Sequence, residues 1–75
     1  MTPQEVEQLI KAGLPDAEVR VMSDDDTHFE AVVVSAGFAG KRPLQRHQLV
    51  YKTLGDLMGG EIHALSIQAK TPDEV

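Results

Sequence analysis

Apolar residues recur along this chain with two different periods, and the change of period outlines its secondary structure. Near the N-terminus, Val6, Leu9 and Ile10 fall on one side of a helix with 3.6 residues per turn. The run Thr2–Glu5 (Thr-Pro-Gln-Glu) just before them has the sequence of a capping box, with Pro at the first helical position. We therefore predict a first helix that ends at Gly13 in a left-handed cap.

A period of two predicts the strands that follow. Residues 17–21 alternate apolar and polar side chains, and residues 29–31 do the same before the β-branched run 32–34. The link 23–27 (Ser-Asp-Asp-Asp-Thr) is strongly polar and rich in turn-forming residues. The pattern predicts a β-hairpin with an acidic, solvated turn. The three consecutive Asp residues lack the alternating spacing of an EF-hand calcium loop.

A second helix and a third strand complete the pattern. Pro43 is suited to open a helix, after which apolar residues recur at helical spacing until Gly59-Gly60. These positions are Leu44, Val50, Tyr51, Leu54, Leu57 and Met58. The segment Glu61–Lys70 then alternates again, which predicts a strand with His63 and Leu65 on the same face.

The order of elements is therefore α-β-β-α-β, and 75 residues are too few for a second core, so we expect one domain. We predict an α+β fold, an α/β sandwich in which two helices cover one face of a three-stranded mixed sheet. A right-handed crossover through the second helix makes the second and third strands parallel. Parallel neighbours start at the same edge of a sheet, so the residues that open these two strands are expected to lie close together.

Composition removes several classes of function. The absence of cysteine excludes a disulfide, a Cys-ligated zinc site and an iron–sulfur cluster held by the chain's own thiolates. There is no Gly-x-Ser-x-Gly elbow, P-loop or dinucleotide-binding fingerprint, so we expect the protein not to be an enzyme. The N-terminus carries no signal-peptide pattern, and the longest apolar run, Ala31–Val34, is far below the roughly 20 residues that span a bilayer. We expect a cytoplasmic protein that does not engage a membrane.

Charge is unevenly distributed along the chain. Twelve acidic and seven basic side chains give a net charge of −5, which disfavours nonspecific binding to nucleic acid. Between Ala31 and Gly55, however, there is no acidic residue. The basic side chains of this segment are Lys41, Arg42, Arg46 and Lys52. A local nucleic-acid-binding patch therefore stays open beside the simpler interpretation of a solvated helix face.

The histidines are the strongest candidates for chemistry. His28 opens the second strand and His63 the third, and neighbouring strands lie about 4.8 Å apart, so both imidazoles are placed to approach one metal ion. Two ligands are fewer than a structural zinc site requires, and a partner that brings sulfur ligands would complete the site. The alternative is that both histidines are partly exposed hydrogen-bonding residues at strand ends. His47 falls on the apolar stripe of the second helix, where we expect a structural role.

These residues together resemble the BolA family. The matching segments, in order and with the family's spacing, are Phe38-x-Gly40, Leu44-x-Arg46-His47-x-x-Val50-Tyr51-x-x-Leu54, Ile62-His63-Ala64-Leu65-Ser66-Ile67 and Thr71-Pro72. The likeness covers nearly the whole chain. It implies a class II KH-like fold in which residues 1–75 form one BolA-like domain.

The resemblance also implies a partner, a cofactor and a site. Members of the family bind monothiol glutaredoxins as heterodimers and share with them a glutathione-ligated [2Fe–2S] cluster, in iron–sulfur trafficking or iron homeostasis. His63 falls on the family's C-terminal cluster histidine. His28 falls on a loop position that is Cys in some members and His in others, so this chain is similar to the His-type bacterial members. Glutaredoxin and glutathione would supply the sulfur ligands, and no cofactor is expected in the isolated chain.

Family members are also described as DNA-binding transcriptional regulators. The resemblance places that nucleic-acid surface on Lys41, Arg42, Arg46 and Lys52. The net negative charge of the chain speaks against this role, so DNA binding is the alternative function. Pairing of two copies in a homodimer is a further arrangement that the sequence leaves open.

Overall fold

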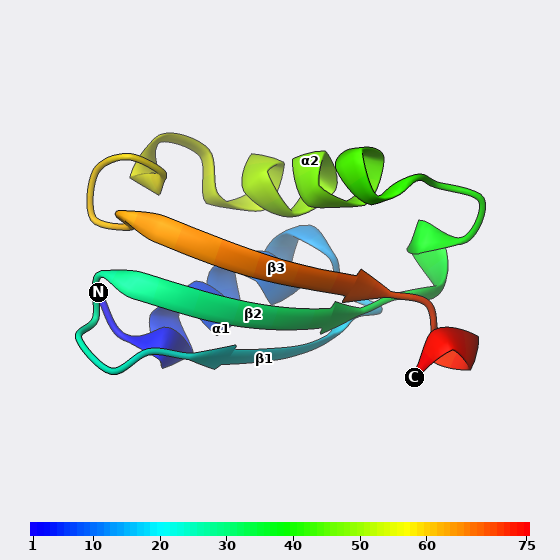
Figure 1. Cartoon of the computed structure of the whole chain (residues 1–75), viewed down its shortest axis with the longest axis horizontal. Coiled ribbons are helices and arrows are strands. Elements are labelled where there is room, and N and C mark those ends of the chain that lie inside the picture. Colours follow the sequence, from blue (N-terminus) through cyan, green and yellow to red (C-terminus); the bar gives the residue numbers. More distant parts are fainter.

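The computed structural model describes residues 1–75 without a gap. Its elements are α1 (Pro3–Gly13), β1 (Glu18–Met22), β2 (His28–Val34), α2 (Pro43–Leu54) and β3 (Ala64–Lys70), with 3₁₀ turns at Ala36–Phe38, Gly55–Leu57 and Pro72–Glu74. The strands form one sheet in the order β1-β2-β3, with β1 antiparallel and β3 parallel to the central β2 (Figure 1). The predicted α+β fold with a three-stranded mixed sheet is therefore confirmed.

One face of the sheet carries the core and the other is open. On β2 the buried Phe29 and Ala31 alternate with the exposed His28 and Glu30. Both helices contribute buried residues to the core that contains Phe29, so they cover the same face of the sheet. The core residues are Val6, Ile10, Ala17, Val21, Phe29, Ala31, Val33, Phe38, Val50, Leu54, Ile62 and Leu65. The open face leaves His28 and Glu30 available to solvent.

The first helix begins as predicted but ends differently. In its capping box the Thr2 hydroxyl accepts from the backbone N–H of Glu5 (3.3 Å), and the Glu5 carboxylate accepts from that of Thr2 (3.0 Å). The prediction of a left-handed cap at Gly13 is wrong, because Gly13 has no positive φ and the helix is capped at Leu14. A Cβ atom at Gly13 would lie 2.5 Å from Cγ2 of Thr53. The glycine is needed because α1 and α2 approach each other closely there.

The second helix is shorter than the sequence pattern predicts. It ends at Leu54, because Gly55 takes a φ of +56° and the chain continues as a 3₁₀ turn. Only Val50 and Leu54 of this helix are buried, whereas Leu44 is 69% exposed. The predicted apolar stripe is thus correct at Val50 and Leu54 and wrong at Leu44 and Tyr51, both of which are exposed. Neither α1 nor α2 has the length and apolar stretch that crossing a membrane requires.

The third strand begins at Ala64, three residues later than predicted. Ile62 is fully buried, whereas the next residue, His63, is exposed. A turn closed by the hydrogen bond from the Gly59 N–H to the Ile62 carbonyl (2.9 Å) directs Ile62 into the core before the strand pairing starts. The expectation that His63 shares a face with the buried Leu65 is therefore wrong. The correction matters for function because it leaves His63 at the surface.

Candidate metal centre

The parallel pairing of β2 and β3 brings His28 and His63 together. His28 is the register partner of Ala64, so both strands start at the same end of the sheet (Figure 1). The carbonyl of Thr27 accepts hydrogen bonds from the N–H groups of His63 (2.9 Å) and Ala64 (3.3 Å), which fixes the start of β3 against the β1–β2 loop. The two imidazoles stack with ring centroids 6.2 Å apart and planes inclined by 13°. Two residues far apart in the sequence thus form one exposed pair.

The spacing of the two rings fits two ligands of one metal ion. A metal–nitrogen bond of about 2.1 Å places an imidazole centroid roughly 3.2 Å from the ion, so two rings on one ion have centroids at most roughly 6.4 Å apart. The observed separation of 6.2 Å lies inside this limit. The rings are nearly parallel, so one nitrogen of each has to turn toward a common point. His63, whose ring forms no hydrogen bond, is free to rotate, and an approach of the centroids by about 1 Å would give a tetrahedral angle between the two bonds.

The pair offers free nitrogens but no further ligands. No hydrogen bond occupies Nε2 of His28 or either ring nitrogen of His63, and both residues are exposed. No third His, Asp or Glu side chain joins them in a group that could hold a metal ion. A metal centre at this position would therefore have two imidazoles from this chain, and every other ligand would have to come from elsewhere.

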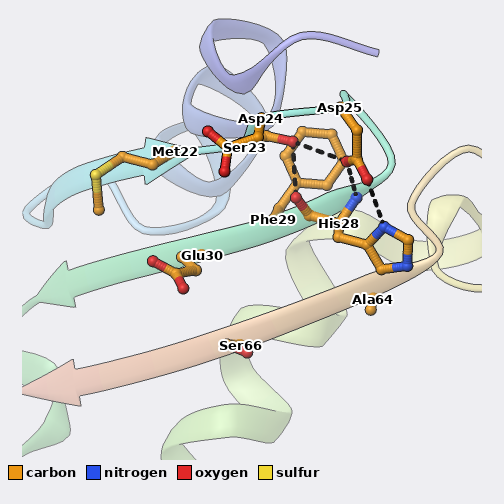
Figure 2. Close-up of a pocket in the computed structure, with 9 residues that line it drawn as sticks. All are labelled: Met22, Ser23, Asp24, Asp25, His28, Phe29, Glu30, Ala64 and Ser66. Carbon is orange, nitrogen blue, oxygen red and sulfur yellow. Dashed lines mark hydrogen bonds and ion pairs between the residues drawn. The ribbon is translucent and has the colours of Figure 1, made fainter.

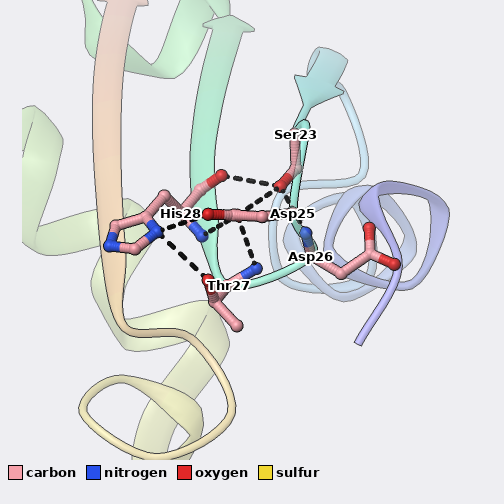
Figure 3. Close-up of polar contacts among 5 residues, drawn as sticks. All are labelled: Ser23, Asp25, Asp26, Thr27 and His28. Atoms are coloured by element: carbon pink, nitrogen blue, oxygen red, sulfur yellow. Dashed lines mark hydrogen bonds and ion pairs between the residues drawn. The ribbon is translucent and has the colours of Figure 1, made fainter.

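The loop between β1 and β2 is organised by its own side chains (Figure 3). Oδ1 of Asp25 accepts from the backbone N–H groups of Thr27 (3.0 Å) and His28 (2.9 Å). Oγ of Ser23 accepts from the N–H of Asp26 (2.9 Å) and donates to the carbonyl of His28 (2.7 Å). Asp26 has a φ of 58°, a left-handed conformation that Asp tolerates better than most residues. The segment that the sequence predicts as a solvated turn is thus a loop held together by its own hydrogen bonds, and it ends at His28.

Asp25 also contacts the imidazole of His28, a role that the sequence analysis missed. Its Oδ2 lies 2.8 Å from Nδ1 of His28, and Oγ1 of Thr27 lies 3.1 Å from the same nitrogen. The backbone N–H groups of His28 and Thr27, followed by the His28 side chain, hold the pKa of Asp25 well below its usual range. The Ser-x-Asp-x-x-His spacing is only a partial signal. It is typical of a turn in which Asp bonds backbone N–H groups ahead of it, but it does not single out Asp25 among three consecutive Asp residues.

An open pocket of about 450 Å³ lies beside His28, between the β1–β2 loop and the open face of the sheet (Figure 2). Its lining residues are Met22, Ser23, Asp24, Asp25, His28, Phe29, Glu30, Ala64 and Ser66. The carboxylates of Asp24, Asp25 and Glu30 make the wall acidic, so the pocket favours a positively charged group of a ligand or partner.

Arg46, one of the four basic residues of the nucleic-acid hypothesis, is used by the fold. Its side chain is only 13% exposed and forms a 2.7 Å ion pair with Glu74. The guanidinium also donates to the backbone carbonyls of Ala69 (3.1 Å) and Lys41 (2.9 Å). Arg46, together with the backbone N–H of Thr71, lowers the pKa of Glu74 to about 2. These contacts tie the start of α2 to the end of β3 and to the C-terminal turn.

The other basic residues keep their exposure. Lys41, Arg42 and Lys52 are exposed, although the Lys41 ammonium donates to the carbonyl of Gly37 (3.0 Å). The structure therefore leaves three of the four predicted cationic side chains at the surface. His47 is half-buried on α2 and does not join the other two histidines in a metal-binding group.

Comparison with known proteins identifies relatives of the chain. A family model described as BolA, BolA-like protein, matches residues 8–74. BolA-like protein 1 of Mus musculus is 52% identical over 52 residues, which cover 69% of this chain and 38% of the mouse protein. The DNA-binding transcriptional regulator BolA of Vibrio cholerae is 49% identical over 49 residues, which cover 65% of this chain and 46% of that protein. The chain thus spans less than half the length of either relative.

Solved structures agree with the fold. A bolA protein homologue from Coxiella burnetii is 46% identical, with a TM-score of 0.83 over 99% of this chain and 95% of that one. The BolA domain of SufE1 from Arabidopsis thaliana is 36% identical, with a TM-score of 0.84 over 97% of this chain and 94% of that one. The similarity therefore includes both helices and all three strands.

Proposed function

The chain belongs to the BolA-like family, and we propose that it is the partner of a monothiol glutaredoxin, with which it shares a glutathione-containing [2Fe–2S] cluster in iron–sulfur trafficking or iron homeostasis. The observation that carries the proposal is the exposed pair of His28 and His63, whose separation suits two ligands of one ion. The relatives are named as BolA-like proteins or as a regulator, not as enzymes. A binding role agrees with these names.

The two proteins would supply complementary ligands. This chain offers two imidazoles and has no cysteine, while a monothiol glutaredoxin and glutathione each offer a thiolate. Imidazole replaces thiolate on one iron of Rieske [2Fe–2S] centres, so a mixed set of nitrogen and sulfur ligands is chemically sound. His28 and His63 would bind iron, and the shared cluster would be the group that is transferred or sensed.

The test is anaerobic reconstitution of the cluster in a mixture of this protein, a monothiol glutaredoxin and glutathione. The wild-type mixture should develop visible absorption and circular dichroism that differ from those of glutaredoxin with glutathione alone. His63→Ala should abolish this difference, and His28→Ala should change the spectrum or accelerate cluster loss while the two proteins still associate. His47→Ala is the matched control, because His47 lies outside the pair and should leave the spectrum unchanged.

Two outcomes would count against the proposal. If His63→Ala leaves the spectrum of the mixed complex unchanged, His63 is not a ligand. If the affinity between the two proteins is the same with and without iron, and no iron or acid-labile sulfide copurifies with the complex, the chain is an adaptor without a metal.

DNA binding is the second candidate function. The observations that favour it are the name of the Vibrio cholerae relative and the exposure of Lys41, Arg42 and Lys52. It predicts retardation of a DNA duplex with an affinity that falls steeply with salt and weakens on Lys52→Glu. Absent or salt-independent binding would remove this candidate.

A further inference from the structure

We propose that Asp25 is the positioning residue of His28, because it holds the imidazole with its proton on Nδ1 and so directs the lone pair of Nε2 outward to the metal. This inference rests on the proposed function, since it assigns Asp25 a role toward the same cluster. It is based on the hydrogen bonds that Asp25 forms within the β1–β2 loop. Neither the proposed pairing of the histidines nor the family resemblance accounts for these bonds.

The first step is the chemistry of the contact between Asp25 and His28. A carboxylate accepts hydrogen bonds and cannot donate one, so its partner nitrogen has to carry a proton. Oδ2 of Asp25 lies 2.8 Å from Nδ1 of His28. Neutral imidazole has one protonated and one unprotonated nitrogen, so Nε2 is the unprotonated one. The hydroxyl oxygen of Thr27 lies 3.1 Å from the same Nδ1 and can accept a hydrogen bond from it as well. This contact is therefore compatible with a proton on Nδ1.

The carboxylate of Asp25 is held in place by the backbone of the loop. Its other oxygen, Oδ1, accepts from the backbone N–H groups of Thr27 and His28 at 3.0 and 2.9 Å. Ser23 closes the ring by donating to the carbonyl of His28 at 2.7 Å. With both oxygens occupied, the carboxylate presents a fixed edge to the ring. The loop therefore sets the orientation of the imidazole before any metal binds.

The hydrogen bond at Nδ1 affects how His28 can bind a metal. A ligating histidine commonly donates its second N–H to a carboxylate, which fixes the tautomer and makes the ligating nitrogen more basic. His28 has this arrangement, whereas His63 is placed by stacking on His28 and by its backbone bond to Thr27. The two ligands are thus held differently, and Asp25 acts on one of them only.

Asp25→Asn separates the positioning role from the folding of the loop. The Asn side chain keeps an oxygen for the N–H groups of Thr27 and His28 but presents an NH₂ donor to Nδ1, which favours the proton on Nε2 and turns the lone pair inward. Asp26→Asn is the matched control, because it makes the same change of charge in the same loop at an exposed residue outside the pocket, whose side chain forms no hydrogen bond (Figure 3).

Two readouts test the inference. Long-range ¹H–¹⁵N correlation spectra of the isolated protein, at a pH where histidine is neutral, should show His28 protonated on Nδ1 in the wild type and in Asp26→Asn, and mainly on Nε2 in Asp25→Asn. In the reconstituted mixture with glutaredoxin and glutathione, Asp25→Asn should weaken cluster binding about 10- to 100-fold. Asp26→Asn should bind the cluster like the wild type.

A wild-type spectrum with the proton on Nε2 overturns the inference without any variant, so the test stands even where Asp25→Asn loosens the loop. Equal cluster binding by Asp25→Asn and Asp26→Asn also overturns it. A proton on Nδ1 combined with a wild-type mixture that forms no His-dependent cluster has a different meaning. That result contradicts the proposed function and leaves the orientation of His28 by Asp25 in place.

Discussion

At the end of the sheet where β2 and β3 begin, the imidazoles of His28 and His63 lie at the surface, and only Nδ1 of His28 has hydrogen-bond partners in the chain. At the end where β3 finishes, the side chain of Arg46 is 13% exposed, and its guanidinium donates to Glu74 and to the carbonyls of Ala69 and Lys41. Both ends carry residues that the sequence marks as candidates for binding.

The difference separates polar groups that build the fold from polar groups that are free to bind. A side chain whose hydrogen bonds are satisfied within the chain stabilises the folded state and has little capacity left for a partner. An exposed imidazole with an unprotonated, unpartnered nitrogen keeps that capacity. By this criterion we propose that binding takes place at the histidine end, whereas the contacts of Arg46 serve the fold.

The largest expected effect is on cluster binding by His63→Ala. This variant should lose the cluster signal of the mixed complex, while its free energy of unfolding should stay within about 0.5 kcal/mol of the wild type because the side chain is exposed and forms no hydrogen bond. Visible absorption of the mixture and urea denaturation of the isolated protein check the two halves. A large loss of stability would mean that His63 supports the fold instead.

Arg46→Ala should show the opposite behaviour. It removes a charged donor from three acceptors and should lower the free energy of unfolding by about 2 kcal/mol, since hydrogen bonds to charged groups contribute about 1.5–3 kcal/mol. The cluster of the mixed complex should survive. If Arg46→Ala kept the urea midpoint of the wild type but lost the cluster, Arg46 would be a binding residue and not a residue of the fold.

The pH dependence of stability should report the Arg46 end. The pKa of Glu74 is lowered from 4.5 to about 2, so its contact with Arg46 contributes stability that is present above pH 4.5 and is lost as the pH falls toward 2. Glu74→Gln should therefore be less stable than the wild type near neutral pH and should lose less stability over that acidic range. Urea midpoints measured from pH 7 to pH 2 check this. If the urea midpoints of the two proteins fell equally between pH 7 and pH 2, protonation of Glu74 would not contribute to the loss of stability in acid.

The smallest effect is expected from Asp26→Asn, in the β1–β2 loop. Asn tolerates a positive φ at least as well as Asp, and the hydrogen bond at this position comes from the backbone N–H. The free energy of unfolding should change by less than about 0.5 kcal/mol, and the cluster should be retained. Asp26→Val, whose β-branched side chain is strained at this φ, should destabilise the loop more. Equal stability of the two variants would show that the left-handed backbone at residue 26 does not matter.

The sequence was sufficient for the features that depend on local pattern and topology. The capping box at Thr2 and the element order follow from residues close in the chain. The crossover rule makes β2 and β3 parallel, and that alone places His28 beside His63. The sequence could not show where β3 starts, because the burial of Ile62 depends on a turn that breaks the period of two.

Two contacts at the candidate sites were beyond sequence reasoning for different reasons. The ion pair between Arg46 and Glu74 joins residues that only the packing of α2 against the end of β3 brings together, so it left no local pattern. The contact between Asp25 and His28 is local, but three consecutive Asp residues give no sign of which one bonds the ring. The hydrogen bonds that single out Asp25, to the N–H groups of Thr27 and His28 and to the His28 ring, are visible only in the structure.

The most direct test of whether His28 and His63 are cluster ligands is to detect nitrogen from this chain on the cluster iron. The mixed complex is assembled from ¹⁵N-labelled chain with unlabelled glutaredoxin and glutathione, reduced by one electron, and examined by pulsed electron paramagnetic resonance. We predict ¹⁵N couplings of the strength of directly bound imidazole from two histidines, of which His28→Ala removes one set. A spectrum of the reduced cluster without ¹⁵N coupling would contradict the claim that His28 and His63 hold it.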